Sequence, residues 1–187
     1  DTLDGGTGTD TASYAGATAG VTVTLASSAA QNTVNAGLDT LINIENLIGS
    51  GFNDALTGNS GANLLQGWLG NDTLNGGLGN DTLDGGTGTD TASYAGATTG
   101  VTVTLATPGV AQNTLNAGTD TLTSIENLTG SAFNDSLSGD AGANHLQGGL
   151  GDDTLNGGAG ADTLIGGDGN DSYLVDNAGD VVSETNA

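Results

Sequence analysis

A nine-residue period constrains the fold of this chain more than any other feature of its sequence. Residues 148–174 consist of three consecutive lines, GGLGDDTLN, GGAGADTLI and GGDGNDSYL. Each line has glycine at positions one, two and four, aspartate at position six, and Leu or Tyr at position eight. A period of nine fits neither a continuous helix nor a continuous strand. It fits a six-residue turn followed by a three-residue strand, repeated as a solenoid.

The same period extends through much of the chain. The apolar eighth position recurs every nine residues at Leu47, Leu56, Leu65, Leu74, Leu83 and Ala92, and again at Leu128, Leu137, Leu146, Leu155, Leu164, Tyr173 and Val182. An acid or its amide stands two residues before each of them. We expect glycines to supply the positive φ of tight turns, and the eighth position to point into a core while positions seven and nine point outward.

A second, longer repeat contains the first. Residues 1–25 and 81–105 are identical except that Ala19 is answered by Thr99. Residues 31–67 likewise correspond to residues 112–148, after a one-residue insertion near Pro108. The chain is therefore two copies of one unit of about 80 residues.

We expect one continuous solenoid over residues 1–187. Its regular nonapeptide blocks are predicted at 1–13, 49–93 and 130–174, and less regular solenoid segments at 14–48 and 94–129. Alternation predicts strands at 21–25 and 101–105. Val101 lies nine residues after Ala92, so we expect the solenoid to continue there in this register, with longer, less liganded loops.

The charge of the chain excludes several partners. The chain contains 22 acidic residues and no Lys or Arg, which gives it a net charge of −22. This charge excludes nucleic acid as a ligand and disfavours an anionic membrane surface, and no apolar run reaches transmembrane length, so no membrane insertion is expected. The chain has no cysteine, which rules out disulfides and thiolate metal sites.

The composition indicates that the folded chain needs a bound cation for its stability. Glycine takes 35 positions and aromatic residues only 3%, so the burial of one leucine per repeat cannot offset the ordering of nine residues beside a column of carboxylates. Carboxylate and carbonyl oxygens form a hard ligand environment that selects Ca²⁺ over Zn²⁺ or copper. Mg²⁺ requires a tighter octahedron and fits such turns poorly.

The lines GGLGNDTLD (76–84) and GGAGADTLI (157–165) resemble the RTX nonapeptide GGxGxDxUx, a calcium-binding repeat. This resemblance implies an all-β fold, a right-handed parallel β-roll with two nonapeptides per coil and calcium ions between stacked Gly/Asp turns n and n+2. It also implies that the ligands are the position-six aspartates and the carbonyls of positions one to four.

Carried onto this chain, the resemblance implies five pairs, which are Asp54/Asp72, Asp72/Asp90, Asp135/Asp153, Asp153/Asp171 and Asp162/Asp180. The implied metal-site residues are Gly6, Gly8, Asp10, Asp54, Asp72, Gly77, Gly79, Asp81, Gly86, Gly88, Asp90, Asp135, Gly149, Gly151, Asp153, Gly158, Gly160, Asp162, Gly167, Gly169, Asp171 and Asp180. We expect Asp10 to pair with turns upstream of residue 1.

Several positions depart from the repeat. Asn63 and Asn144 are neutral, which predicts weaker sites with Asp81 and Asp162. Position two is Trp68 in one line, Phe52 and Phe133 replace the fourth-position glycine, and 175–178 lacks the glycines around the Asp180 site. Glu45 and Glu126 are either ligands at the start of a column or exposed side chains. His145 is interpreted as a solvated surface residue, because position seven faces outward.

These features favour a non-enzymatic calcium-binding region of a bacterial secreted protein. The family resemblance implies export by type I secretion machinery and folding on calcium outside the cell. The alternative is a structural repeat unit of an extracellular filament, surface layer or adhesin stalk, with copies of the chain as partners. A polysaccharide-binding module would require an aromatic or basic groove, and the sequence offers no sign of one. No HExxH, GxSxG or P-loop motif is present.

Overall fold

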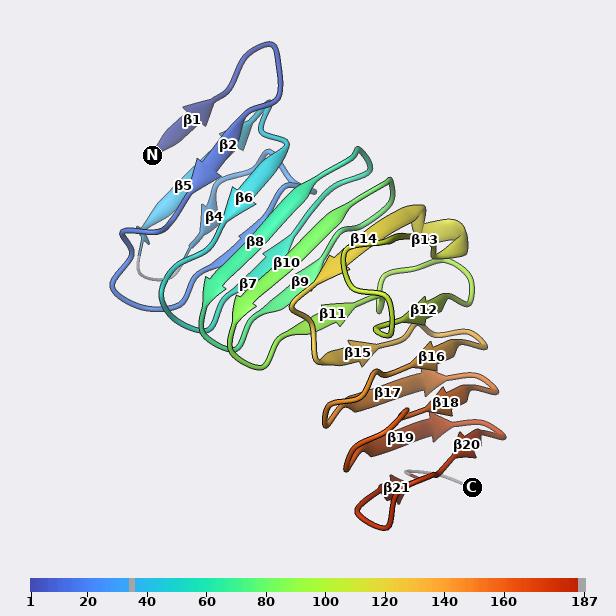
Figure 1. Ribbon diagram of the computed structural model, residues 1–187. Helices are drawn as coiled ribbons and strands as arrows, with labels where there is room; N and C mark the ends of the chain where they lie inside the picture. The colour runs from blue at the N-terminus through green and yellow to red at the C-terminus, as the bar shows by residue number, and fades with distance from the viewer. Residues whose placement is uncertain (34–35, 185–187) are drawn as a thin grey trace.

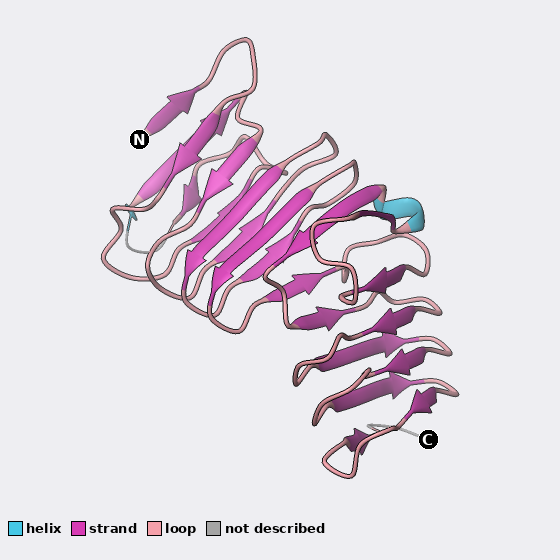
Figure 2. Cartoon of the chain, in the orientation of Figure 1, coloured by secondary structure: helices cyan, strands magenta, loops and turns pink. Residues whose placement is uncertain are grey.

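The computed structural model describes residues 1–33 and 36–184. Within this part of the chain nearly all regular structure is strand, and the strands stack as successive rungs of a coil (Figures 1 and 2). The 3-10 turn η2 (Leu115–Ala117) lies beside the rungs. No helix in the described part of the chain is long and apolar enough to cross a membrane. The predicted all-β fold with parallel strands, a β-roll, is confirmed.

Four sheets carry the strands. The three-stranded sheet orders β1 (Thr2–Asp4), β5 (Leu38–Ile42) and β4 (Gln31–Asn32). The six-stranded sheet orders β13 (Ala111–Asn113), β14 (Thr119–Thr123), β10 (Thr82–Thr87), β8 (Leu64–Leu69), β6 (Asn46–Ile48) and β2 (Thr11–Ser13). The eight-stranded sheet orders β21 (Val181–Ser183), β19 (Thr163–Asp168), β17 (His145–Leu150), β15 (Asn127–Thr129), β11 (Thr91–Ser93), β9 (Thr73–Asn75), β7 (Ala55–Thr57) and β3 (Thr22–Thr24). The four-stranded sheet orders β12 (Thr102–Thr104), β16 (Ser136–Ser138), β18 (Thr154–Asn156) and β20 (Ser172–Leu174).

Strand register confirms that one coil consists of two nonapeptides. Leu47 pairs with Leu65, which pairs with Leu83, so neighbouring parallel strands of one sheet are 18 residues apart. Consecutive nonapeptides therefore alternate between two sheets, and each sheet receives every second repeat. The predicted three-residue strand is also present, as in β7 and β9.

The core lies between the two sheets and consists of one residue per nonapeptide. Position eight is fully buried at Leu65, Leu74 and Leu155, each 0% exposed. Positions seven and nine on the same strands are at least partly exposed, as predicted for side chains that alternate across a strand. Within the regular nonapeptide blocks the core is therefore a narrow stack of leucines, and the less regular segments add Tyr14, Val21, Tyr94, Val101 and Leu105 to the same cluster.

The two copies of the long repeat interrupt opposite faces of the coil. In the first copy β1 pairs with β5 while β2 pairs directly with β6. In the second copy the equivalent of β1 is β10, which pairs with β14 but lies in the same sheet as β2. The equivalent strands β1 and β10 thus lie in different sheets, so the inserted hairpin β13–β14 extends the six-stranded sheet, whereas β4–β5 belongs to the three-stranded sheet.

The register predicted at Val101 is wrong by two residues. The strand there is β12, and its Val103, not Val101, pairs with Leu137 in the leucine column. Val101 takes the place of a position-six residue, because its N–H donates to Asp135 Oδ1 at 2.7 Å. The turn that follows Ser93 is longer than a nonapeptide turn and shifts the register. The predicted strands at 21–25 and 101–105 are present as the shorter β3 and β12.

Candidate metal centre

The position-six side chains form ladders along the turns of the coil. Asp72 Oδ1 accepts a hydrogen bond of 2.8 Å from Asp54 N, and Asp90 Oδ1 accepts one of 2.7 Å from Asp72 N. The same link joins Asp135 to Asp153 at 2.7 Å. Each ladder therefore fixes one oxygen of a buried carboxylate onto the backbone of the preceding coil.

All five predicted pairs are neighbours in the structure. The remaining two are joined by bonds from Asp153 N to Asp171 Oδ1 at 2.8 Å and from Asp162 N to Asp180 Oδ1 at 3.1 Å. The neutral positions keep the same spacing, since Asn63 N donates to Asp81 Oδ1 and Asn144 N donates to Asp162 Oδ1, each at 2.8 Å.

The second oxygen of many of these carboxylates has no hydrogen-bond donor. Among the described residues, the buried Oδ2 atoms without a partner belong to Asp10, Asp72, Asp81, Asp90, Asp153, Asp162 and Asp171. A buried charged acceptor that has lost water and gained no donor is strongly unfavourable. Each of these turns therefore contains an oxygen that requires a cation or a proton.

Main-chain carbonyls face the same spaces. A side chain on Gly67 would collide with both Asp72 Oδ2 and the carbonyl oxygen of Gly85 in the next coil. One on Gly148 would collide with Asp153 Oδ2 and the carbonyl oxygen of Gly166. Position-one glycine thus keeps open a space where two oxygens from successive coils converge with no donor between them.

The predicted glycines at positions two and four lie along these turns with positive φ. They are Gly6, Gly8, Gly77, Gly79, Gly86, Gly88, Gly149, Gly151, Gly158, Gly160, Gly167 and Gly169. Gly77 lies against the carbonyl oxygen of Asn59, and Gly169 against that of Gly151, each from the preceding coil. A Cβ on Gly77 or Gly169 would displace the stacked backbone, so these two positions favour glycine for close approach as well as for φ, whereas Gly6 has no such contact.

Burial also changes the acidity of the ladder. Burial raises the pKa of Asp72 and Asp81 to about 7 and that of Asp153 to about 6. Neighbouring carboxylates, such as Asp54 and Asp90 beside Asp72, raise the pKa further. Hydrogen bonds from backbone N–H groups act in the opposite direction and do not overcome burial. In the absence of a cation, burial therefore shifts the protonation equilibrium of these side chains toward the neutral form.

The available ligands are oxygens. In the described part of the chain no three Asp, Glu, His or Cys side chains converge closely enough to hold a metal by themselves. A site must therefore combine a carboxylate with backbone carbonyls, which is a donor set that suits Ca²⁺. The residues present fit that ion. His145 lies at the outward position seven of β17, away from the ladder.

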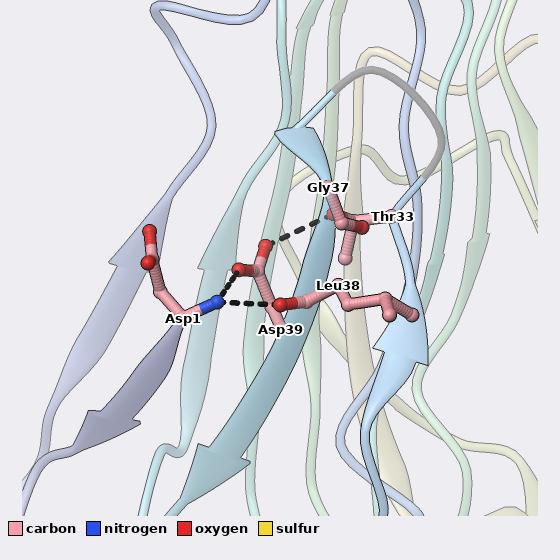
Figure 3. Close-up of polar contacts among 5 residues, drawn as sticks. All are labelled: Asp1, Thr33, Gly37, Leu38 and Asp39. Atoms are coloured by element: carbon pink, nitrogen blue, oxygen red, sulfur yellow. Dashed lines mark hydrogen bonds and ion pairs between the residues drawn. The ribbon is translucent and has the colours of Figure 1, made fainter.

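Two ladder aspartates escaped the sequence analysis. Asp120 Oδ1 accepts a 2.9 Å bond from Asp81 N, and its Oδ2 accepts one of 3.1 Å from Thr114 Oγ1. Burial raises the pKa of Asp120. Its first-copy equivalent, Asp39, accepts 2.9 Å bonds from the amino nitrogen of Asp1 and from Thr33 Oγ1 (Figure 3). The tripeptide Asp-Thr-Leu, shared with residues 72–74, was the available signal, but the hairpins place it off the nine-residue period.

The two glutamates also belong to the ladders. Glu45 Oε2 accepts a 2.9 Å bond from Asp10 N, and Glu126 Oε2 accepts a 2.8 Å bond from Asp90 N. They hold the position-six place and are half-buried, so they are not simply exposed side chains, and their role as ligands stays a prediction. The N–H of Asp10 donates to the downstream residue Glu45, as the N–H of Asp54 or Asp72 does in the other ladders, and the expected pairing of the Asp10 carboxylate with turns upstream of residue 1 stays a prediction.

The departures from the repeat are accommodated in different ways. Trp68 adopts a φ of 83°, so it keeps the left-handed backbone of the glycine it replaces, with its side chain 48% exposed. Phe52 and Phe133 also project outward, 46% and 45% exposed. Asp180 is half-buried, and its Oδ2 accepts bonds of 3.1 and 3.0 Å from Asp176 N and Asn177 N. Hydrogen bonds from the backbone of Asp162 and Asn177 lower its pKa.

Comparison with known protein families supports the same repeat. The profile of the RTX calcium-binding nonapeptide repeat, which spans four copies, matches residues 48–83, 58–92, 120–155, 138–173 and 147–181. Together these matches span residues 48–92 and 120–181, which is more than half of the chain. A search of curated proteins finds no match to the chain. On its turn geometry and on these matches, the chain belongs to the RTX calcium-binding nonapeptide repeat family.

Proposed function

We propose that this chain is a non-enzymatic, calcium-dependent β-roll of a bacterial secreted protein, which folds when it meets calcium outside the cell. One observation carries the proposal, namely the buried Oδ2 atoms that face carbonyl oxygens across successive coils with no donor between them. A divalent cation that accepts about six to eight oxygens satisfies both partners at once.

The ligand residues of this proposal are the seven aspartates whose Oδ2 atoms lack a donor, together with the carbonyls of the adjacent turns. The ion supplies positive charge between coils and offsets the repulsion within a chain of net charge −22. The ladder hydrogen bonds orient each carboxylate before the ion binds. The position-one glycines keep the space open.

Calcium-dependent folding follows from thermodynamic linkage, and it supports the proposed export. Calcium that binds the folded chain and not the unfolded chain stabilises the fold in proportion to the logarithm of its concentration. Extracellular calcium modules work at about 10⁻⁴–10⁻³ M, far above cytosolic levels. RTX repeats are typical of secreted proteins, and a chain that stays unfolded in the cytosol suits export by type I secretion machinery.

A filament, surface-layer or stalk role is the second candidate. It is favoured by the two copies of the long repeat, which stack so that the eight-stranded sheet runs from β3 to β21 through both. We propose residues 1–187 as one continuous solenoid on the same basis. Light scattering of the calcium-loaded protein over a concentration series distinguishes a self-assembling stalk from a monomeric folding region.

Circular dichroism with and without calcium tests the calcium proposal. We expect an unfolded spectrum in excess EDTA, a β spectrum in millimolar calcium, and no recovery in equal magnesium. A β spectrum that survives excess EDTA would refute calcium-dependent folding. Equal recovery in magnesium would indicate charge screening and not coordination.

A further inference from the structure

The turns of the coil fall into two classes that the nonapeptide consensus does not separate. They differ at position two, in whether its backbone N–H donates to the position-six side chain of the same turn. We call a turn with this bond closed and a turn without it open. The closed turns are 49–54, 58–63, 130–135, 139–144 and 175–180, and the open turns are 5–10, 67–72, 76–81, 85–90, 148–153, 157–162 and 166–171.

In the closed turns that begin Gly-Ser, the protein satisfies the carboxylate completely. Asp54 Oδ2 accepts from Ser50 N at 2.5 Å, and Oδ1 accepts from Ser50 Oγ at 2.8 Å and Val21 N at 2.7 Å. The second copy repeats this arrangement at Ser131 and Asp135. Both oxygens of a carboxylate that is only 4% exposed therefore have donors within the protein. The carbonyl oxygen of Gly67 lies beside Asp54 Oδ2 as in the open turns, so the N–H of Ser50 is what distinguishes the closed turn.

In the closed turns with asparagine, an amide replaces the ion. Asn63 Oδ1 accepts from Asn59 N at 2.7 Å, while Asn63 Nδ2 donates to the carbonyl oxygen of Glu45 at 2.7 Å. Asn144 makes the same two bonds, with Asp140 N at 2.8 Å and with the carbonyl oxygen of Glu126 at 2.7 Å. The Nδ2 group thus donates a hydrogen bond to a carbonyl oxygen that a cation would otherwise bind.

Backbone φ at position two separates the classes. It is positive in the open turns, as at Gly77 (89°), Gly149 (118°) and even Trp68 (83°). It lies outside the left-handed region at Ser50, Asn59, Ser131, Asp140 and Asp176 of the closed turns. A change of φ at this residue rotates the adjoining peptide group, which decides whether its N–H points at the position-six side chain.

We propose that the φ of position two determines which turns take calcium, so that open turns hold ions and closed turns hold none. This inference rests on the proposed calcium function and goes beyond it. It removes Asp54, Asp135 and Asp180 from the ligand set that the family resemblance implies. It also makes the Asn63 and Asn144 turns sites closed by protein hydrogen bonds, in place of weak calcium sites.

The decisive experiment counts ions on the calcium-loaded protein by native mass spectrometry. Asn63→Asp supplies a carboxylate but leaves Asn59 N–H to cap it, so the count should stay at the wild-type value. Asn59→Gly/Asn63→Asp supplies both the carboxylate and a residue free to take positive φ, so the count should rise by one. An extra ion in the single variant would overturn the proposal, as would an unchanged count in a folded double variant.

A second pair covers the case in which the double variant does not fold. Asp54→Asn and Asp72→Asn each remove one buried charge from adjacent rungs of the same ladder. We expect Asp72→Asn to lose one ion and Asp54→Asn to lose none. Loss of an ion from Asp54→Asn overturns the proposal. Wild-type protein that binds no calcium would instead refute the proposed function itself.

Discussion

Asp153 offers the sharpest single-residue test of calcium coupling, because its neighbour Asp152 is a matched control. Asp153 is 1% exposed, its Oδ1 is held by Asp135 N, and its Oδ2 faces the carbonyl oxygen of Gly166 without a donor. Asp152 is exposed and accepts bonds of 2.8 and 3.1 Å from the backbone and side chain of Asn170. Substitution of either by Asn removes one negative charge and little volume.

The expected change in the free energy of unfolding follows from the linkage between calcium binding and folding. A site with a dissociation constant of about 10⁻⁴ M contributes about 2.7 kcal/mol to the free energy of unfolding at a hundredfold excess of calcium. Asp153→Asn should lose this contribution and also reduce the dependence of unfolding free energy on calcium by about 1.4 kcal/mol per tenfold change in concentration. Asp152→Asn should keep the wild-type dependence, because its carboxylate holds Asn170 and no ion.

Urea unfolding at several calcium concentrations, followed by circular dichroism, measures both quantities. The two variants share the same change in net charge, so bulk electrostatics predicts equal effects. Parallel lines of unfolding free energy against the logarithm of calcium concentration for both variants would refute coordination by Asp153.

Three further predictions concern protonation, backbone strain and the core. Burial raises the pKa of Asp72 and Asp81 to about 7, above an unfolded value of about 3.9, so the folded state binds more protons between these limits. The calcium-free fold should therefore gain stability as pH falls from about 8 to about 4, and the calcium midpoint should rise; a β signal in EDTA that does not increase on acidification would contradict this. Trp68→Gly should stabilise the calcium-loaded protein by about 1 kcal/mol in urea unfolding, because left-handed backbone costs a non-glycine residue about 1–2 kcal/mol and glycine returns part of that gain as chain entropy. Leu74→Ala should destabilise it by about 2–5 kcal/mol, because Leu74 is 0% exposed and the neighbouring coils cannot close the cavity; a loss below 1 kcal/mol would indicate that the stack relaxes.

The sequence by itself determined the repeating unit and the chemistry of its ligands. Turn and strand alternate within nine residues, so glycine conformation and the inward direction of Leu65 or Leu155 are local properties that a single line already encodes. The acidic composition and the lack of cysteine likewise restrict the ligands to oxygen without reference to the fold.

The tertiary structure decided which residues join the ladders. Asp120 reaches Asp81 across 39 residues, and Glu126 reaches Asp90 across 36, because the hairpin β13–β14 and the long turn after Ser93 interrupt the period. No local pattern fixes the length of such an insertion in coils. For the same reason Val103, and not Val101, continues the leucine column.

Tertiary structure also separated open from closed turns. By residue type Trp68 belongs with Ser50, since neither is glycine. Yet Trp68 adopts a φ of 83° and leaves Asp72 Oδ2 without a donor, whereas Ser50 N–H caps Asp54. The residue type limits the range of φ but does not fix its value. The choice depends on the stacked carbonyls of the neighbouring coils, which are contacts between residues 18 positions apart in the sequence.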